Sequence, residues 1–164
     1  MDASYQQFVD RVGMHWENEG LPRIAGRIFG FLFLQAEPCS LDEMADGLGV
    51  SKASVSTDAR RLTQLGLLER ASRPGDRRDY YAISPDTPVT AMRLKLRSME
   101  RFRRLVHGAL SLPGTDPAVR ERLEKFDRVH EIIVQSTTGL IERLEQVGRS
   151  GLTSRPSGVA GSES

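Results

Sequence analysis

The residues that could do chemistry are gathered between positions 51 and 83. This stretch begins with small hydroxylated side chains and Lys52, runs through an apolar repeat, and ends in arginines around a glycine and a pair of tyrosines. Hydroxyl, ammonium and guanidinium groups bind phosphate oxygens and donate hydrogen bonds to the edges of bases. These residue types therefore indicate binding to a polyanion, and nucleic acid is the first candidate.

The distribution of charge along the chain points to the same kind of partner. The net charge of the 164 residues is only +1. Residues 51–104 nevertheless hold 13 basic and 6 acidic side chains, whereas residues 1–50 hold 3 and 8 and residues 105–164 hold 7 and 8. A focused basic region on a nearly neutral protein is typical of a polyanion-binding surface, although arginines that only solvate a helix face would give the same count.

The elements that must position these residues are two short helices. Ser40-Leu-Asp-Glu43 is a capping box that begins a helix at residue 41, and Gly49 ends this helix. Ser51 caps a second helix, in which apolar residues recur at the 3.6-residue period and leave the opposite face polar and basic. Two short helices joined by a tight glycine turn predict a helix-turn-helix. The side chains that its second helix would offer to DNA are Ser51, Lys52, Ser54, Thr57, Arg60 and Arg61.

A β-hairpin is predicted directly after the second helix. Residues 67–71 and 79–83 are strand-like runs on either side of the turn-forming residues 72–76. A hairpin in this position is a wing, and its arginines would lie along the flanking DNA backbone or enter the minor groove, where the negative potential attracts them. The wing arginines are Arg73, Arg77 and Arg78.

Two further helices are predicted before this motif. Apolar residues spaced four apart mark an N-terminal amphipathic helix, which Gly20 ends. A core helix follows over residues 23–36, and its Gly26-x-x-x-Gly30 motif would permit a close crossing with another helix. The apolar residues that define the first helix are Phe8, Val12 and Trp16.

Two long helices, residues 89–110 and 117–147, are predicted after the motif, with a Pro113-Gly114 turn between them. In the second, one set of residues alternates steps of four and three, which is the heptad of a coiled-coil-like seam. Such a seam needs a partner helix, either the 89–110 helix of the same chain or the equivalent helix of a second copy. Because the second helix has a further apolar edge beside the heptad, we favour both partners together. The heptad residues are Val119, Leu123, Phe126, His130, Ile133, Thr137, Leu140, Leu144 and Val147.

Three stretches of the chain resemble one known family. GLPRIAGRIFGFLFL, SLDEMADGLGVSKASVSTDARRLTQLGLLER and GDRRDYYAISPD occur in this order over most of residues 15 to 88. They resemble the MarR-type winged-helix transcriptional regulators, and within them the GbsR-like branch. The resemblance implies a homodimer that binds a pseudo-palindromic operator in double-stranded DNA, usually as a repressor and often under the control of a small molecule. It also implies that Arg77 is the wing arginine that enters the minor groove.

The expected fold is mainly α with a small β-hairpin wing, a winged helix-turn-helix with N-terminal and long C-terminal dimerisation helices. We expect residues 1–22 to form a dimerisation helix, 23–88 the DNA-binding domain, 89–148 the C-terminal dimerisation helices, and the Gly-, Ser- and Pro-rich residues 149–164 a disordered tail. The residues expected in the dimer interface are Phe8, Val12, Phe126, His130, Ile133, Leu140 and Leu144.

Two other classes of protein fit the sequence less well. An enzyme would need a constellation of reactive groups, but the three histidines lie far apart and no nucleophile, metal-ligand or phosphate-loop motif occurs. The sequence therefore predicts no catalytic residue, metal or cofactor. A winged helix used only as a protein-interaction module would expose apolar anchors where this chain has a polar helix face and a basic wing. The absence of a secretory pattern and of an apolar run long enough for a membrane span favours the cytoplasm.

Two residues allow a sensing role beside a structural one. Cys39 could be an oxidation sensor, but because the chain has no second cysteine an ordinary thiol is favoured. His130 lies in the heptad, where it could fix the register or respond to pH near its ordinary pKa, and a hydrogen-bonded interface histidine is favoured.

Overall fold

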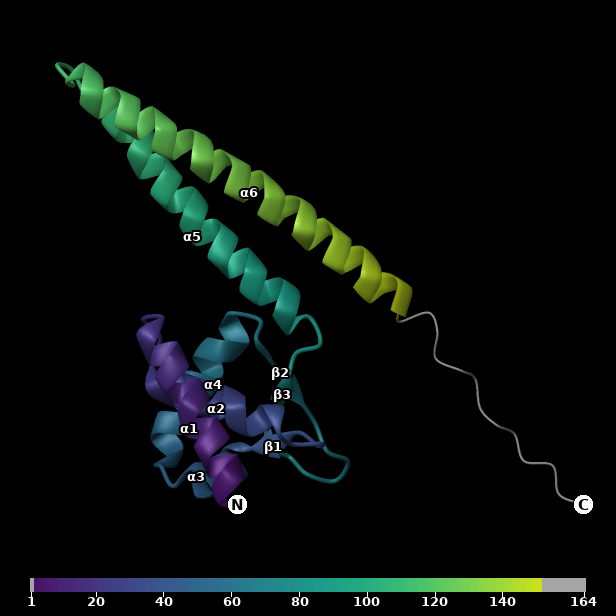
Figure 1. Ribbon diagram of the computed structural model, residues 1–164. Helices are drawn as coiled ribbons and strands as arrows, with labels where there is room; N and C mark the ends of the chain where they lie inside the picture. Colours follow the sequence, from purple (N-terminus) through teal and green to yellow (C-terminus); the bar gives the residue numbers. More distant parts are fainter. Residues whose placement is uncertain (1, 152–164) are drawn as a thin grey trace, which may run out of the picture. The chain divides into compact units, whose positions relative to one another are not determined.

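The computed structural model describes residues 2–151, and the chain forms two compact units (Figure 1). The first unit ends at Thr90 and the second begins at Ala91. The mainly helical fold with a small sheet is confirmed, as is the helix-turn-helix with its wing. The N-terminal helix lies in the first unit, where it packs along the next helix. Residues 152–164, most of the tail predicted to be disordered, lie outside the described residues.

Two helices of the first unit, α1 (Ala3–Asn18) and α2 (Arg23–Phe33), cross closely at small residues. A Cβ atom built on Gly26 would lie 2.8 Å from the Trp16 Cβ and 2.9 Å from the Gly13 Cα, so only glycine fits there without displacement. The close crossing predicted from the glycine motif of α2 is therefore confirmed. α2 ends three residues earlier than predicted, because hydrogen bonds between residues three apart tighten its last turn.

The helix-turn-helix consists of α3 (Leu41–Leu48) and α4 (Lys52–Gln64), and both helices start as predicted. The Ser40 hydroxyl accepts from the Glu43 amide at 3.3 Å, and the Glu43 carboxylate accepts from the Ser40 amide at 2.6 Å, which completes the capping box. Gly49 ends α3 in the left-handed conformation, with φ of 64°. The Ser51 hydroxyl then caps α4 by accepting from the Ser54 amide at 3.2 Å.

Three short antiparallel strands complete the first unit: β1 (Cys39–Ser40), β2 (Leu68–Ala71) and β3 (Tyr80–Ile83). β2 and β3 form the predicted hairpin, with Leu68 opposite Ile83. β1 was not predicted, because two residues are too few to show a period. It pairs with the other edge of β3, with Ser40 opposite Tyr80. The wing is therefore attached through its second strand to the residue that caps α3.

The core of the first unit draws side chains from its helices and from both hairpin strands. Two of these side chains come from α4, so the core fixes which face of α4 points outward. The largest fully buried apolar side chains are Val9, Ile28, Met44, Val55, Leu62, Leu68 and Tyr80.

The second unit is a helical hairpin made by most of α5 (Thr87–Leu110) and by α6 (Pro117–Gly151), which run antiparallel (Figure 1). The turn between them contains Gly114 at a φ of 72°. Asp116 then accepts a hydrogen bond from the Ala118 amide at 2.8 Å and restarts the helix, as the Asp116-Pro117 pair predicted. In the part of the chain that the structure describes, no helix is both long and apolar enough to span a membrane.

One face of α6 packs on α5, and it coincides only in part with the predicted heptad. Asp127 binds Arg103 of α5, and Ile141 is 6% exposed. Half-buried heptad residues on the same face are Leu123, His130, Thr137 and Leu144. Heptad residues that stay 37–38% exposed are Phe126, Ile133 and Leu140. The predicted partner within the chain is therefore confirmed for one face of α6, and a second apolar face remains open.

Candidate nucleic-acid interface

The helix α4 has one buried face and one exposed face. Val55, Ala59 and Leu62 are at most 1% exposed and fix the helix to the core. Because the helical period places the intervening residues on the other side, that side is polar and open to solvent. Exposed on α4 and its N-cap are all six residues that the sequence predicted to meet DNA: Ser51, Lys52, Ser54, Thr57, Arg60 and Arg61.

The hydroxyl groups at the start of α4 are positioned by bonds within the helix. The Ser51 and Ser54 hydroxyls lie 3.0 Å apart, and the Thr57 hydroxyl donates to the Ala53 carbonyl at 3.1 Å. Because this bond uses the only hydroxyl proton of Thr57, its oxygen remains free to accept a hydrogen bond. Such an acceptor suits the exocyclic amino group of a base, and the backbone N–H groups of the same helix end suit a phosphate.

The basic side chains of α4 are exposed and make few contacts, and of their acidic partners Asp42 is exposed whereas Asp58 is buried. Lys52 Nζ lies 2.8 Å from Asp42 of α3, and Arg61 lies 3.4 Å from Asp58 one turn earlier in α4. Within the described residues, the one polar contact of the Arg60 side chain is with the Ser56 hydroxyl, at 3.5 Å. Ion pairs at the surface contribute little to stability, since water and salt compete for both partners. These side chains can therefore turn to a phosphate at small cost.

The three wing arginines have different surroundings. Arg73 lies over the ring of Tyr80, with 4.3 Å between the guanidinium carbon and the ring centre. Arg78 donates to Asp76, with 2.6 Å between Nη2 and Oδ2. Arg77 is exposed and makes no polar contact with any residue of the described part. The arginine that the family resemblance singled out is thus the one without a partner in the wing.

The carboxylate of Asp76 is the centre of the wing. It accepts hydrogen bonds from the Arg78 guanidinium, from the Arg78 amide at 2.9 Å and from the Tyr80 hydroxyl at 2.7 Å. The Arg78 side chain, followed by Tyr80, holds the pKa of Asp76 well below its usual range. The same carboxylate raises the pKa of Tyr80, because it accepts a hydrogen bond from the phenol O–H. At neutral pH the charge of Arg78 is therefore compensated and that of Arg77 is not.

Two acidic residues on the first turn of α3 belong to this region, and sequence reasoning missed them. Asp42 pairs with Lys52, and Glu43 lies 3.5 Å from Arg73. The first turn of α3 therefore contacts both α4 and the wing. Glu43 was recognised from the sequence only as a capping residue. A capping box gives no signal that the second carboxylate oxygen faces a side chain 30 positions away.

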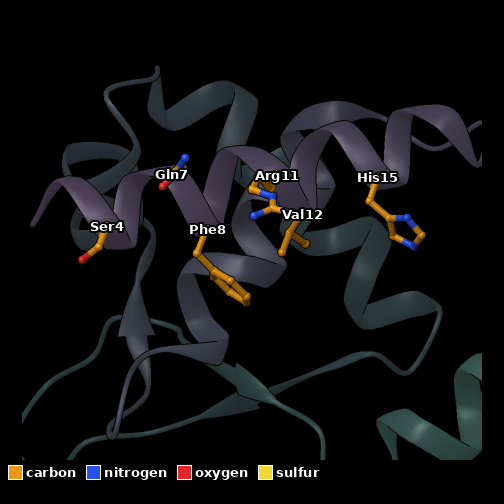
Figure 2. A pocket seen from close by; sticks show the side chains of 6 residues that line it. All are labelled: Ser4, Gln7, Phe8, Arg11, Val12 and His15. Atoms are coloured by element: carbon orange, nitrogen blue, oxygen red, sulfur yellow. The ribbon is translucent and has the colours of Figure 1, made fainter.

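The predicted dimer residues of the first unit lie on α1. Phe8 is exposed, and Val12 is half-buried where α1 crosses α2. Figure 2 shows Phe8, Val12 and His15 extending from the same side of the helix, where they line an open groove of 440 Å³. The groove is completed by Ser4, Gln7 and Arg11.

The predicted dimer residues of the second unit lie on two faces of α6. Phe126 stacks on His130 at 3.9 Å between ring centres and meets Phe102 of α5 edge-on at 5.6 Å. The Nδ1 of His130 lies 3.2 Å from the Phe126 carbonyl, so this histidine has a hydrogen-bond partner within its own helix. Ile133 and Leu140 lie on the open face, whereas Leu144 lies in the row that faces α5.

Cys39 is a buried thiol in β1. It is 7% exposed, and its sulfur contacts the Glu37 carbonyl at 3.6 Å. Burial, and then the nearby charge of Glu43, raise the pKa of the Cys39 thiol, although Arg73 acts in the opposite direction. A buried thiol with a raised pKa holds little thiolate at neutral pH and is a poor nucleophile, which favours the structural interpretation of this residue.

Comparison with known proteins gives consistent matches. A family model described as the MarR family matches residues 19–79. The HTH-type transcriptional regulator MmpR5 of Mycobacterium tuberculosis is 35% identical over 122 residues, which are 74% of this chain and 74% of that protein. The HTH-type transcriptional repressor OpcR of Bacillus subtilis is 24% identical over 86 residues, which are 52% of this chain and 46% of that protein. A crystal structure of a transcriptional regulator matches with a TM-score of 0.72 and 30% identity, covering 87% of this chain and 99% of that one.

Proposed function

The chain belongs to the MarR family of winged helix-turn-helix transcriptional regulators, and on that premise we propose that it is a repressor that binds a pseudo-palindromic operator as a homodimer. Proteins of this family are DNA-binding regulators and not enzymes, which confirms the prediction that the chain is not an enzyme. Repression is supported by the name of the Bacillus subtilis relative. The motifs that resemble the GbsR-like branch support that finer placement, and the family supports control by a small molecule and a place in the cytoplasm.

The observation that carries the proposal is the division of α4 into a buried apolar face and an exposed polar face with small residues at its start. Ala53 and Ser54 leave room for the helix N-terminus to enter the major groove, which is about 12 Å wide. Base contacts would then come from Ser54 and Thr57, and phosphate contacts from the more distal Arg60 and Arg61. The wing, with its uncompensated Arg77, would reach the adjacent minor groove.

A protein-interaction module is the alternative function, and α4 provides the observation that bears on it. Protein interfaces take most of their binding energy from large apolar or aromatic anchors. On α4 the large apolar side chains Val55 and Leu62 are buried, and the exposed side chains are Ala53, hydroxyls, Lys52, arginines and Gln64. This surface suits a polyanion better than an apolar protein partner.

The proposal of a homodimer is supported by apolar side chains that the folded chain leaves open. On α6, Phe126, Ile133 and Leu140 are each more than one third exposed, and Ile132 is 64% exposed. Several large apolar side chains left exposed on one helix are typical of an interaction site in a soluble protein. The corresponding helix of a second copy would present the same side chains, and a two-fold axis would bring the two sets together.

The test of the proposed function is the binding of two labelled duplexes of equal length, one recovered by selecting bound fragments from the source genome and one of random sequence. Fluorescence anisotropy at several salt concentrations should show that the selected duplex binds at least about 10³-fold more tightly. Its affinity should also fall with salt, by about 0.9 in log–log slope for each phosphate contact. Equal binding of both duplexes, or binding that does not depend on salt, would contradict operator recognition and favour the interaction module.

A further inference from the structure

Five side chains connect the wing to the start of α3, and we call them the wing brace. They come from α3, from the turn between β2 and β3, and from β3, so they lie within the first unit. Sequence reasoning placed two of the five in contact with DNA. The members of the wing brace are Glu43, Arg73, Asp76, Arg78 and Tyr80.

Arg73 makes the contacts that cross from the wing to the helix-turn-helix. Its Nη2 donates to the Pro38 carbonyl at 2.6 Å, and its Nη1 lies 3.5 Å from Glu43 Oε1. The guanidinium carbon also lies over the Tyr80 ring, 4.3 Å from its centre. A guanidinium can make several directed hydrogen bonds and stack on a ring at once, and the ammonium of lysine cannot. The contacts of Arg73 therefore require an arginine and not merely a positive charge.

Glu43 supports Arg73 from the capping box of α3. Its Oε2 accepts a hydrogen bond from the Ser40 amide at 2.6 Å, and its Oε1 lies 3.5 Å from Arg73 Nη1. The hydrogen bond from the Ser40 amide is the main cause that lowers the pKa of Glu43, and Arg73 lowers it further. Glu43 is therefore an ionised and fixed partner. One carboxylate both starts α3 and holds the wing.

Tyr80 is the fixed point on the other side of Arg73. It is 1% exposed, and two guanidinium groups lie near its ring, that of Arg73 at 4.3 Å and that of Arg78 at 5.6 Å from the ring centre. Its hydroxyl donates to Asp76 at 2.7 Å, and Asp76 in turn accepts from Arg78. The turn that holds Arg77 is thus tied at both ends to a buried side chain.

These contacts divide the wing arginines into two kinds. Arg73 and Arg78 have carboxylate partners, Glu43 and Asp76, that compensate their charges. Arg77 is exposed between residues of the brace and has no polar partner in the described chain. A phosphate or minor-groove contact by Arg73 would require it to leave its carbonyl, carboxylate and ring contacts together. Arg77 can make such a contact without breaking any.

We propose that Arg73 is a positioning residue that holds the wing against the start of α3, and not a DNA contact of the kind already proposed for Arg77. This inference rests on the proposed operator binding and assigns roles within it. The brace acts before DNA is bound, since all its contacts exist in the free chain. Loss of the brace should therefore lower affinity without removing a phosphate contact.

The first arm of the test compares Arg73→Ala with Arg77→Ala in salt titrations on the operator. Arg77→Ala should reduce the log–log salt slope by about 0.9, the value for one lost phosphate contact. Arg73→Ala should keep the wild-type slope and weaken binding by roughly two- to tenfold, the factor that one lost hydrogen bond gives. An Arg73→Ala slope reduced as much as that of Arg77→Ala would make Arg73 a phosphate contact and overturn the inference.

The second arm uses Glu43→Gln. The affinity for DNA should rise in this variant if Arg73 binds phosphate and fall if Arg73 positions the wing. Glutamine can still complete the capping box, but it no longer compensates the charge of Arg73. If Arg73 binds phosphate, removing the acidic group should strengthen binding to any DNA. If Arg73 positions the wing, Glu43→Gln and Arg73→Lys should both weaken operator binding. Stronger binding by Glu43→Gln would overturn the inference.

Hydrogen exchange in the free protein tests the wing brace without DNA, and therefore independently of the proposed operator binding. The amides of Asp76 and Arg78 are hydrogen-bonded within the wing, at 3.1 Å and 2.9 Å. They should exchange faster in Glu43→Gln and Arg73→Lys, and at the wild-type rate in Arg77→Ala. Unchanged exchange in the first two variants would show that there is no brace. If the wild-type chain bound no operator, the proposed function would be contradicted. The exchange rates would still show whether the wing brace exists, because they are measured without DNA.

Discussion

A hydroxyl on an exposed helix face can read a base only if it keeps hydrogen-bonding capacity. Thr57 donates to the Ala53 carbonyl and so presents an acceptor with a fixed direction. The Ser54 hydroxyl is hydrogen-bonded to the Ser51 hydroxyl, which lies 3.0 Å away, and so keeps either a donor or an acceptor for another group. Neither side chain packs in the core. Substitutions here are therefore expected to change recognition and leave folding nearly unchanged.

Ser54→Ala or Thr57→Ala should each weaken operator binding by roughly 1–3 kcal/mol and change binding to random DNA little, as expected for a lost base contact. Arg60→Ala or Arg61→Ala should weaken both by similar factors, because these side chains lie a turn further from the helix start and would meet the backbone. Anisotropy titrations on both duplexes measure this. Gln64→Ala, at the end of the same helix, is the control.

The assignment would be reversed if the arginine variants lost operator preference while the Ser54 and Thr57 variants kept it. A lower melting temperature of any of these variants would point instead to a role in folding.

The Cys39 thiol is expected to react slowly in the folded protein. Burial raises its pKa, so at pH 8 the thiolate fraction should be smaller than in an unfolded chain, where the pKa is about 8.5. Alkylation by iodoacetamide at pH 8 should therefore be at least about tenfold slower in native protein than in protein unfolded by urea. Equal alkylation rates in native and unfolded protein would mean that the thiol is accessible in the folded chain, and would favour the oxidation-sensor interpretation.

Periodicity predicted which side chains of α4 face outward, but not what they contact. All six predicted residues are exposed because a helix that buries Val55, Ala59 and Leu62 must expose the others. The contact between Arg73 and Glu43 joins residues 30 positions apart. Such contacts depend on how the strands and helices pack, and a pattern within one element contains no information about them.

At the scale of elements, the crossing of α1 and α2 depends on the absence of a side chain at Gly26. Gly26→Ala would place a Cβ within 2.9 Å of backbone atoms of α1, so it should lower the free energy of unfolding by roughly 1–3 kcal/mol. Gly108→Ala in α5 is the matched control, because its Cβ would meet nothing within 4 Å. That variant should gain up to about 1 kcal/mol from helix propensity. Urea unfolding measures both, and a stabilised Gly26→Ala would refute the close crossing.

Substitutions at two neighbouring residues of α6 should affect two different properties, the folding stability of the helical hairpin and the association of two chains. Ile141 is 6% exposed, so Ile141→Ala should cost roughly 2–5 kcal/mol of folding stability. Leu140 is 37% exposed, so Leu140→Ala should leave the monomer stable and weaken dimerisation by more than about 1 kcal/mol. Sedimentation equilibrium and thermal melting measure the two effects. If Leu140→Ala associates like wild type, the interface lies elsewhere.

The long and strongly periodic helices were predicted well, whereas the two-residue strand β1 was not predicted. The capping box and the caps at Ser51 and Asp116 gave the starts of three helices, because a cap is a local arrangement of neighbouring residues. β1 consists of two residues, and its only support is the pairing with β3. The heptad of α6 was predicted as one seam, although its residues divide between two faces, since a straight helix drifts away from a 3.5-residue repeat.

For the whole molecule, the proposed homodimer predicts a symmetric footprint. Two recognition helices related by a two-fold axis should enter successive major grooves about 10 base pairs apart, so the protected site should be an inverted repeat. Light scattering of the free protein at tens of micromolar should give twice the mass of one chain. A monomer under these conditions, or a footprint without a dyad, would contradict the dimer.

The two faces of α4 have a consequence for how regulators of this kind diversify. Folding depends on its buried residues Val55, Ala59 and Leu62, and recognition is proposed for its exposed ones. Exposed substitutions usually change stability by no more than about 0.5 kcal/mol. After gene duplication, one copy could therefore acquire a new target sequence through a series of folded intermediates. For the same reason, a library randomised at positions 53, 54, 57 and 60 should yield mostly folded proteins from which regulators of chosen promoters can be selected.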